Sequence, residues 1–176
     1  MSSMKSDYDR SNLHDVPSYQ KIFSQIRQYK SKNSRTLWIQ PALYLMVLTG
    51  ARITELTLLK KKDVKFFDYS NRELYGEFTF SDVASVQFNL FTEKNRKNKY
   101  RIVPVVKNDF FLEALEEIYN YWQKIEYDSS YLFYRSRQSM WFGVKRALGK
   151  DYYPHLMRHI SVTNDTKAGI SPSILK

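Results

Sequence analysis

Apolar residues recur at helical spacing in the first third of the chain. One stripe predicts a helix over residues 15–29, with Asp15 at its start, and a continuous apolar run predicts a buried helix over 37–48. A third helix is predicted over 52–62, where its last turn would carry three lysines. Gly50 separates the second and third helices and suits a helix end, because glycine adopts a left-handed backbone at little cost.

From residue 64 onward the pattern changes to the alternation expected of strands. Short strands are predicted over 64–67, 74–80, 86–91 and 101–105. The last two enclose the polar segment 92–100, so they are expected to pair as a β-hairpin with a charged tip.

Helical spacing then returns for the rest of the chain. The pattern predicts a helix over 109–122 capped by Asp109, a helix over 135–148 that ends at Gly149, and a helix that begins after Pro154. The predicted fold class is therefore α+β: a mainly α-helical domain with a small antiparallel sheet and a basic β-hairpin.

Charge and composition indicate which kinds of partner and site the protein can have. The chain has 176 residues, a net charge of +10 and a pI near 9.6, which favours an acidic partner, with nucleic acid first and an anionic membrane second. It has no cysteine, which excludes disulfides and thiolate metal sites. No apolar run approaches the roughly 20 residues that span a bilayer, so an intracellular, soluble protein is expected. Residues 1–14 are polar and patternless and are predicted to be a disordered leader or linker, leaving 15–176 as one domain.

Arg52 is the first candidate for binding chemistry. It lies at the predicted junction of two packed helices, where a rigid guanidinium and a helix N-terminus could together grip a phosphate. Glu55, three residues later, lies on the same helical face and could orient the guanidinium. The alternative is an ordinary surface arginine paired to Glu55.

A second candidate group follows Pro154. His155 and Arg158 are one turn apart near a predicted helix N-terminus, where backbone N–H groups favour an anion. His159 lies on the adjacent face. A zinc site is not favoured, because no glutamate stands between His155 and His159 in the HExxH pattern.

The predicted hairpin tip is the third candidate. It carries four cations, which could reach into a DNA groove or lie along its backbone: Lys94, Arg96, Lys97 and Lys99. The alternative is an exposed hairpin that charge keeps soluble. Apolar flanking strands favour the functional interpretation, because they would anchor the tip to the core.

Together, three segments resemble the catalytic domain of tyrosine recombinases, the phage integrase family. They are residues 48–56 (LTGARITEL), the basic hairpin that ends in residues 101–104 (RIVP), and residues 155–159 (HLMRH). Each segment alone is weak evidence for the family, whereas the order and spacing of all three over residues 15–170 are strong evidence.

The resemblance implies a role for each matching residue. Arg52 corresponds to the first catalytic arginine, which grips the scissile phosphate, and Arg158 to the second arginine of that clamp. His155 corresponds to the histidine that assists proton transfer. Glu55 corresponds to the acidic residue that supports the first arginine, and His159 to the histidine that often follows the HxxR box.

The resemblance also implies a lysine in the hairpin that protonates the leaving 5′-oxygen. Lys94 is the first choice, because it closes the outgoing strand before the turn, and Lys97 is the rival. In the family a tyrosine attacks the phosphate and forms a 3′-phosphotyrosyl link, with no metal or cofactor, since the arginines offset the transition-state charge.

The sequence departs from the family pattern in two places. Residues 1–14 cannot form the helical core-binding domain that usually precedes the catalytic domain. Residues 160–176 contain no tyrosine, histidine or tryptophan, although the family's nucleophilic tyrosine lies in this direction. We interpret the chain as a catalytic domain without its tyrosine segment, either trimmed at both ends, a fragment of an interrupted gene, or served by a tyrosine from another subunit.

The expected function is site-specific DNA recombination or integration, with cleavage inactive in this chain by itself. The expected partners are double-stranded DNA and further copies on that DNA, with no membrane, in the cytoplasm or on nucleoid or nuclear DNA. One alternative is a non-catalytic DNA-binding module or inactive integrase fragment. Another is an RNA-binding or scaffold protein with coincidental motifs.

Overall fold

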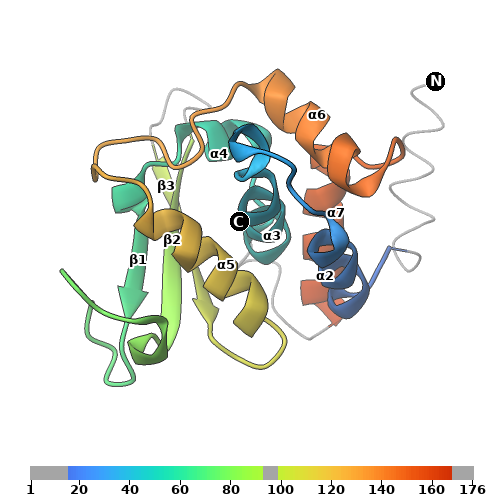
Figure 1. The fold of residues 1–176 in the computed structure, drawn as a ribbon. Coiled ribbons are helices and arrows are strands. Elements are labelled where there is room, and N and C mark those ends of the chain that lie inside the picture. Colours follow the sequence, from blue (N-terminus) through green and yellow to red (C-terminus); the bar gives the residue numbers. More distant parts are fainter. Residues whose placement is uncertain (1–15, 93–98, 168–176) are drawn as a thin grey trace.

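A single helix, α3 (Ile39–Thr49), lies at the centre of the molecule in the computed structural model, which describes residues 16–92 and 99–167 (Figure 1). It is buried at every position except Gln40. The sheet and α5 lie on one side of it and α2, α6 and α7 on the other (Figure 1). Their bounds are α2 Tyr19–Gln28, α5 Leu112–Gln123, α6 Arg137–Leu148 and α7 Pro154–Lys167, and the short α4 spans Ile53–Leu58.

The sheet has three antiparallel strands in the order β1 (Val64–Phe67), β2 (Ser85–Thr92) and β3 (Lys99–Val106). Val103 lies opposite Phe88 in the β2–β3 register, and Phe88 in turn lies opposite Val64 in β1. All three side chains are buried, so alternate residues of each strand face the core. The fold is therefore the predicted α+β arrangement with a small antiparallel sheet.

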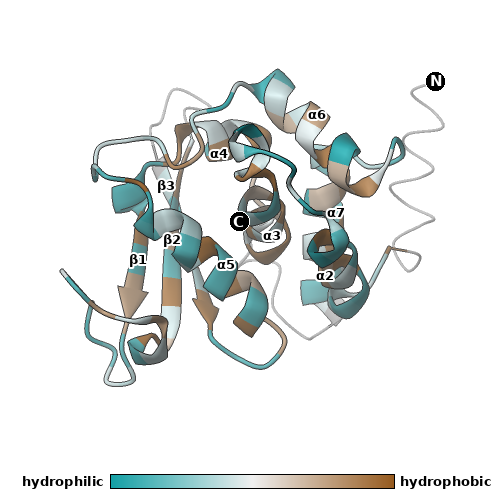
Figure 2. Cartoon of the chain, viewed as in Figure 1, coloured by the Kyte–Doolittle hydropathy of each residue, from teal (hydrophilic) through white to brown (hydrophobic). Residues whose placement is uncertain are grey.

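Hydropathy follows this layering. Figure 2 shows hydrophilic and hydrophobic turns alternating along α5 and α6, as expected of helices with one face in solvent. Aromatic rings fill the space between sheet and α5, where Phe66 lies 5.5 Å from Tyr119 and 4.7 Å from Trp122, both edge-on. Within the described residues, no helix is both long and apolar enough to cross a bilayer.

The predicted strand over 74–80 is wrong. That segment forms no strand: the residue before it, Glu73, makes an isolated bridge with Phe67, and the Leu74 N–H donates to Phe66 O at 2.8 Å. Gly76 has a φ of +67°, which interrupts extended structure. Phe78 instead packs its ring 5.6 Å from Phe66, so the apolar residues of this segment serve as a cover over the core.

Several predicted helix ends also differ. The first helix begins at Tyr19, with Ser18 as its cap, rather than at Asp15, which lies outside the described residues. The helix after Arg52 ends at Leu58, because Leu59 is extended and Lys60 forms a bridge with Tyr131.

Asp109 does not cap α5, which begins at Leu112. The turn ahead of it is held by Asn108, whose side chain accepts from the Phe111 N–H at 2.9 Å. Leu112 itself is exposed rather than inward. The predicted leader, residues 1–14, lies outside the described residues.

Candidate phosphate-binding site

The turn between α3 and α4 is the structural base of the site. Gly50 closes α3 with a φ of +66°, and its N–H donates to Met46 O at 2.9 Å. The Thr49 hydroxyl donates to Leu45 O at 2.7 Å and accepts from the Ala51 N–H at 3.1 Å. Gly50, Thr49 and Ala51 are all buried. The turn is therefore fixed by its own hydrogen bonds and by packing, as the predicted glycine helix end requires.

Arg52 follows this turn with an extended backbone and an exposed side chain. Its N–H donates to Glu55 Oε1 at 2.7 Å, which is the return half of a capping box. Glu55 thus supports Arg52 through the backbone, not through the guanidinium as the sequence predicted. Among the described residues, no acidic side chain lies within ion-pair distance of the Arg52 guanidinium.

The carboxylate of Glu55 is taken by Arg101 instead. Arg101 Nη2 lies 2.9 Å from Glu55 Oε1, and Nε donates to Oε2 at 3.3 Å. The two side chains are 8% and 1% exposed, so this is a buried ion pair in a fork-to-fork arrangement. Arg101 Nη1 also donates to Thr49 O at 3.3 Å. The sequence pattern placed Arg101 in a strand and in the matching segment 101–104 but gave it no role, because nothing local distinguishes it from the surface cations nearby.

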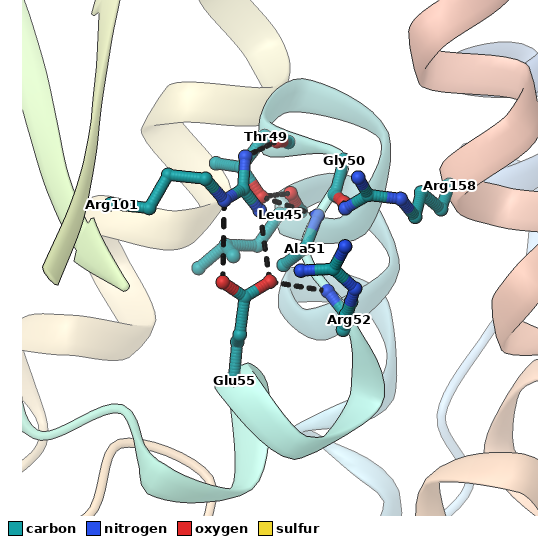
Figure 3. Close-up of polar contacts among 8 residues, drawn as sticks. All are labelled: Leu45, Thr49, Gly50, Ala51, Arg52, Glu55, Arg101 and Arg158. Carbon is teal, nitrogen blue, oxygen red and sulfur yellow. Dashed lines mark hydrogen bonds and ion pairs between the residues drawn. The ribbon is translucent and has the colours of Figure 1, made fainter. Parts of the chain in front are cut away.

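Arg158 reaches the same turn from α7. Its Nη1 donates to Gly50 O at 2.7 Å, and the side chain is half-buried. Burial lowers the pKa of Arg158 from its ordinary value, and the nearby positive charges of Arg52 and Arg101 lower it further, against the opposing effect of Glu55. Figure 3 shows Arg101 arriving from β3 and Arg158 from α7, with Arg52 between them beside the turn.

A cavity of about 610 Å³ opens over these side chains. Three of the predicted site residues line this cavity, although they are far apart in the sequence: Arg52, His155 and Arg158. His155 is exposed, whereas His159 is half-buried and does not line the cavity. The predicted i, i+3 relation of His155 and Arg158 therefore places both at one opening.

Helix α6 supplies part of this cavity that sequence reasoning missed. Arg137, Gln138 and Trp141 line it from the first turns of that helix. Their spacing of one, three and four residues puts them on one helical face, which is the signal that could have grouped them. Trp141 is 43% exposed, so its ring is accessible at the cavity.

Of the four predicted hairpin cations, the structure describes the backbone of one, Lys99. Lys94, Arg96 and Lys97 lie outside the described residues. The backbone of Lys99 begins β3 and pairs with Thr92. The strands that lead to the tip are thus observed, and the roles of the tip cations stay predictions.

A second cationic cavity, of about 660 Å³, borders a different face of α6. Trp38, Ile39 and Phe142 supply apolar lining, and five cations surround it: Arg35, Arg135, Lys145, Arg146 and Lys150. In the part of the chain that the structure describes, neither this cavity nor the first is lined by an acidic residue. The described residues also contain no cluster of three or more His, Cys, Asp or Glu that could hold a metal ion.

Comparison with known proteins gives a family and a fold. The sequence model of the Phage integrase family matches residues 18–176. Two solved structures of the XerH site-specific recombinase are similar to this chain, one bound to difH substrate in a pre-cleavage complex and one bound to palindromic difH in a post-cleavage complex. Their sequence identities are 17% and 18%, with a TM-score of 0.54 for both, over 90% and 89% of this chain. The matches cover 46% and 42% of those chains, so this chain spans about half their length. No curated protein sequence matches it.

Proposed function

The chain belongs to the phage integrase family, the tyrosine recombinases, and we propose that it supplies the phosphate-binding part of an active site for site-specific DNA recombination. One observation carries the proposal: Arg52 and Arg158, which are 106 positions apart in the sequence, line one cavity together with His155. Arg52 follows the fixed turn, and Arg158 on α7 is hydrogen-bonded to it, so two guanidinium forks are available for the oxygens of a phosphodiester.

The proposed reaction is a transesterification. A tyrosine hydroxyl attacks the scissile phosphorus, the bond to the 5′-oxygen breaks, and a 3′-phosphotyrosyl link forms. Arg52 and Arg158 hold the non-bridging oxygens and offset the negative charge that grows on them in the transition state. His155 assists proton transfer at the mouth of the cavity. Rejoining is the reverse attack by a 5′-hydroxyl of the partner strand. Residues 160–176 contain no tyrosine, and we propose that the attacking tyrosine comes from another segment or another copy.

Double-stranded DNA is the proposed partner, with several copies of the protein assembled on it. The net charge of +10 supports this choice, because counterion release from DNA favours a strongly basic protein. The alternative from the sequence is a DNA-binding module that holds the backbone without cutting it. Both interpretations use the same cations, and cleavage separates them.

The test is a covalent-adduct assay on the full-length gene product with a labelled duplex that carries the DNA flanking its gene. We expect an adduct that survives denaturation, and its loss by about a thousandfold or more in Arg52→Ala and Arg158→Ala. Arg146→Ala, a matched arginine in the second cavity, should leave the rate unchanged. A wild-type protein that binds the duplex without an adduct would favour the DNA-binding module, and adduct formation by the alanine variants would refute the assigned roles.

The hairpin lysine can be assigned in the same assay. A substrate with sulfur in place of the bridging 5′-oxygen releases a thiolate, which leaves without protonation. We propose Lys94 as the proton donor, so Lys94→Ala should cleave the ordinary substrate slowly and the sulfur substrate normally. Rescue of Lys97→Ala instead would transfer the role to Lys97. The remaining tip cations, Arg96 and Lys99, are proposed to contact the DNA backbone and should show no sulfur rescue.

A further inference from the structure

Arg101 is a buried arginine that the proposed reaction does not use. It extends from β3, where it lies opposite Leu90, and reaches Glu55 and the Thr49 carbonyl across the interior. Its side chain is 8% exposed, and it is not among the residues that line the first cavity. A buried arginine with three directed contacts on one turn must act on that turn.

The first effect of Arg101 is electrostatic. Glu55 carries a carboxylate next to Arg52 and influences Arg158, whose pKa it raises against the effects of its positive neighbours. A carboxylate in that position could neutralise either guanidinium. Because Arg101 holds both oxygens of Glu55, the carboxylate is compensated behind the turn. The positive charges of Arg52 and Arg158 are then left for an anion in the cavity.

The second effect is mechanical. Glu55 Oε1 accepts from both Arg101 and the Arg52 N–H, at 2.9 and 2.7 Å. One carboxylate oxygen thus links strand β3 to the backbone of the cavity arginine. Arg158 holds the next carbonyl of the same turn, Gly50 O (Figure 3). Hairpin, turn and α7 therefore share one hydrogen-bonded centre.

We propose that Arg101 is a positioning residue, which keeps Glu55 away from the cavity guanidiniums and fixes the hairpin relative to them. The inference rests on the proposed function, since its benefit is the binding of a DNA phosphate by Arg52 and Arg158. It predicts that loss of Arg101 weakens DNA binding because the Glu55 carboxylate is no longer paired. Removing the Glu55 charge should then restore DNA binding.

The experiment measures binding of a short fluorescein-labelled DNA duplex by the chain over a series of salt concentrations. Arg101→Met should weaken binding severalfold and reduce the salt slope by about one phosphate contact, although Arg101 itself does not reach the DNA. Arg101→Met combined with Glu55→Gln should restore the wild-type slope, since glutamine can still accept from the Arg52 N–H but carries no charge. Arg27→Met breaks the exposed Arg27–Glu113 pair and is the matched control, with no expected change.

A merely structural Arg101 would give a different pattern. The double variant would then bind no better than Arg101→Met, or would fail to fold, and either result overturns the inference. Arg101→Lys keeps the charge and loses the fork, so it should retain the wild-type slope with a lower melting temperature, and a reduced slope there also contradicts the idea. If Arg52→Ala and Arg158→Ala keep the wild-type slope, the proposed function fails and the inference with it. If only those two lose slope while Arg101→Met matches Arg27→Met, the inference alone fails.

Discussion

The two cationic cavities on either side of α6 are similar in size and charge but differ in what lies beneath their cations. In the first, Arg158 is tied to Gly50 O, and Arg52 stands on a turn that a buried ion pair holds. In the second, the Arg135 guanidinium lies 5.5 Å from the Trp38 ring, and Lys145 donates to Lys150 O at 2.7 Å. Trp38 is buried, so these cations are held by a ring and by a backbone carbonyl, and among the described residues no buried ion pair lies beneath them.

The comparison separates charge from pre-organisation. A phosphate is held tightly when the donors are already in place, because little conformational entropy is then lost on binding. Cations of the second cavity contact rings and backbone carbonyls, whereas Arg52 and Arg158 meet at one buried turn that an ion pair supports. The first cavity therefore has the features of a catalytic phosphate site, and the second has those of a general basic surface.

Among variants that compare the two cavities, the largest effect should come from replacing arginine by lysine, which preserves charge and removes the planar fork. Arg158→Lys should slow adduct formation by the full-length gene product about a hundredfold, since the lysine ammonium lacks the planar fork that donates to Gly50 O from one nitrogen and leaves a second nitrogen for a phosphate oxygen. Arg146→Lys in the second cavity should leave the rate within error of wild type. If both lysine variants cleave normally, charge alone is sufficient and the contrast between the cavities is lost.

The sequence predicts the parts of the first cavity that local signals encode. The glycine helix end at Gly50, the helix after Pro154 and the face shared by His155 and Arg158 all follow from spacing and residue type. The partner of Glu55 does not follow, because Arg101 lies 46 positions away and only strand register brings it near. Local rules paired Glu55 with the nearest arginine.

The errors in the fold have a similar origin. Residues 74–80 alternate like a strand, but Phe78 packs on Phe66, and backbone pairing with β1 stops after the bridge at Glu73 and the Leu74 N–H bond to Phe66 O. The helix after Arg52 stops at Leu58 because Lys61 and Lys62 donate their N–H groups to Ser130 O and Asp128 O. Such tertiary hydrogen bonds override helix propensity and leave no trace in the local pattern.

The anchoring of α7 can be altered without touching either cavity. Asp165, near the far end of α7, accepts a hydrogen bond from the Tyr19 hydroxyl of α2, and burial raises its pKa to about 7. Its unfolded-state pKa is near 3.8, so the unfolded chain releases a proton that the folded chain keeps. The contribution of Asp165 to the free energy of unfolding is therefore fully present below about pH 4. It falls as the pH rises toward 7 and is lost above about pH 7.

Asp165→Asn should remove this dependence. We expect the variant to be more stable than wild type at pH 8 by about 2 kcal/mol, with a difference that shrinks toward pH 4. Urea unfolding at several pH values measures it, with the exposed Asp151→Asn as the control that should follow wild type. A stability difference that is constant with pH would show that Asp165 does not titrate in this range.

The rigidity of the turn beneath the first cavity gives a smaller effect. Gly50 and Gly76 have nearly equal φ values, +66° and +67°, but an added Cβ would lie 3.3 Å from Ser161 Oγ at Gly50 and meet nothing within 4 Å at Gly76. Gly76→Ala should therefore cost about 1 kcal/mol for the left-handed backbone alone. Gly50→Ala should cost about 0.5–1 kcal/mol more through crowding against α7.

Thermal unfolding compares the two glycine variants, and DNA binding gives the second readout. Gly50→Ala should also weaken binding of the duplex, because Arg158 depends on the Gly50 carbonyl, whereas Gly76→Ala should not. Equal melting temperatures for both variants would mean that the α3–α7 contact yields easily. The turn would then not be the rigid base that distinguishes the first cavity.

The smallest effect is expected in the second cavity, where Lys145→Gln and Arg146→Gln together remove two charges. Lys145 is already engaged with the Lys150 carbonyl and lies over the Trp141 ring, and Arg146 is exposed to solvent, so neither is held ready for a phosphate. We expect duplex affinity to change by less than about 0.5 kcal/mol, as for surface substitutions in general. A salt slope lower by about two phosphate contacts would instead mean that DNA lies across both cavities, and that the cations of the second are part of the binding surface.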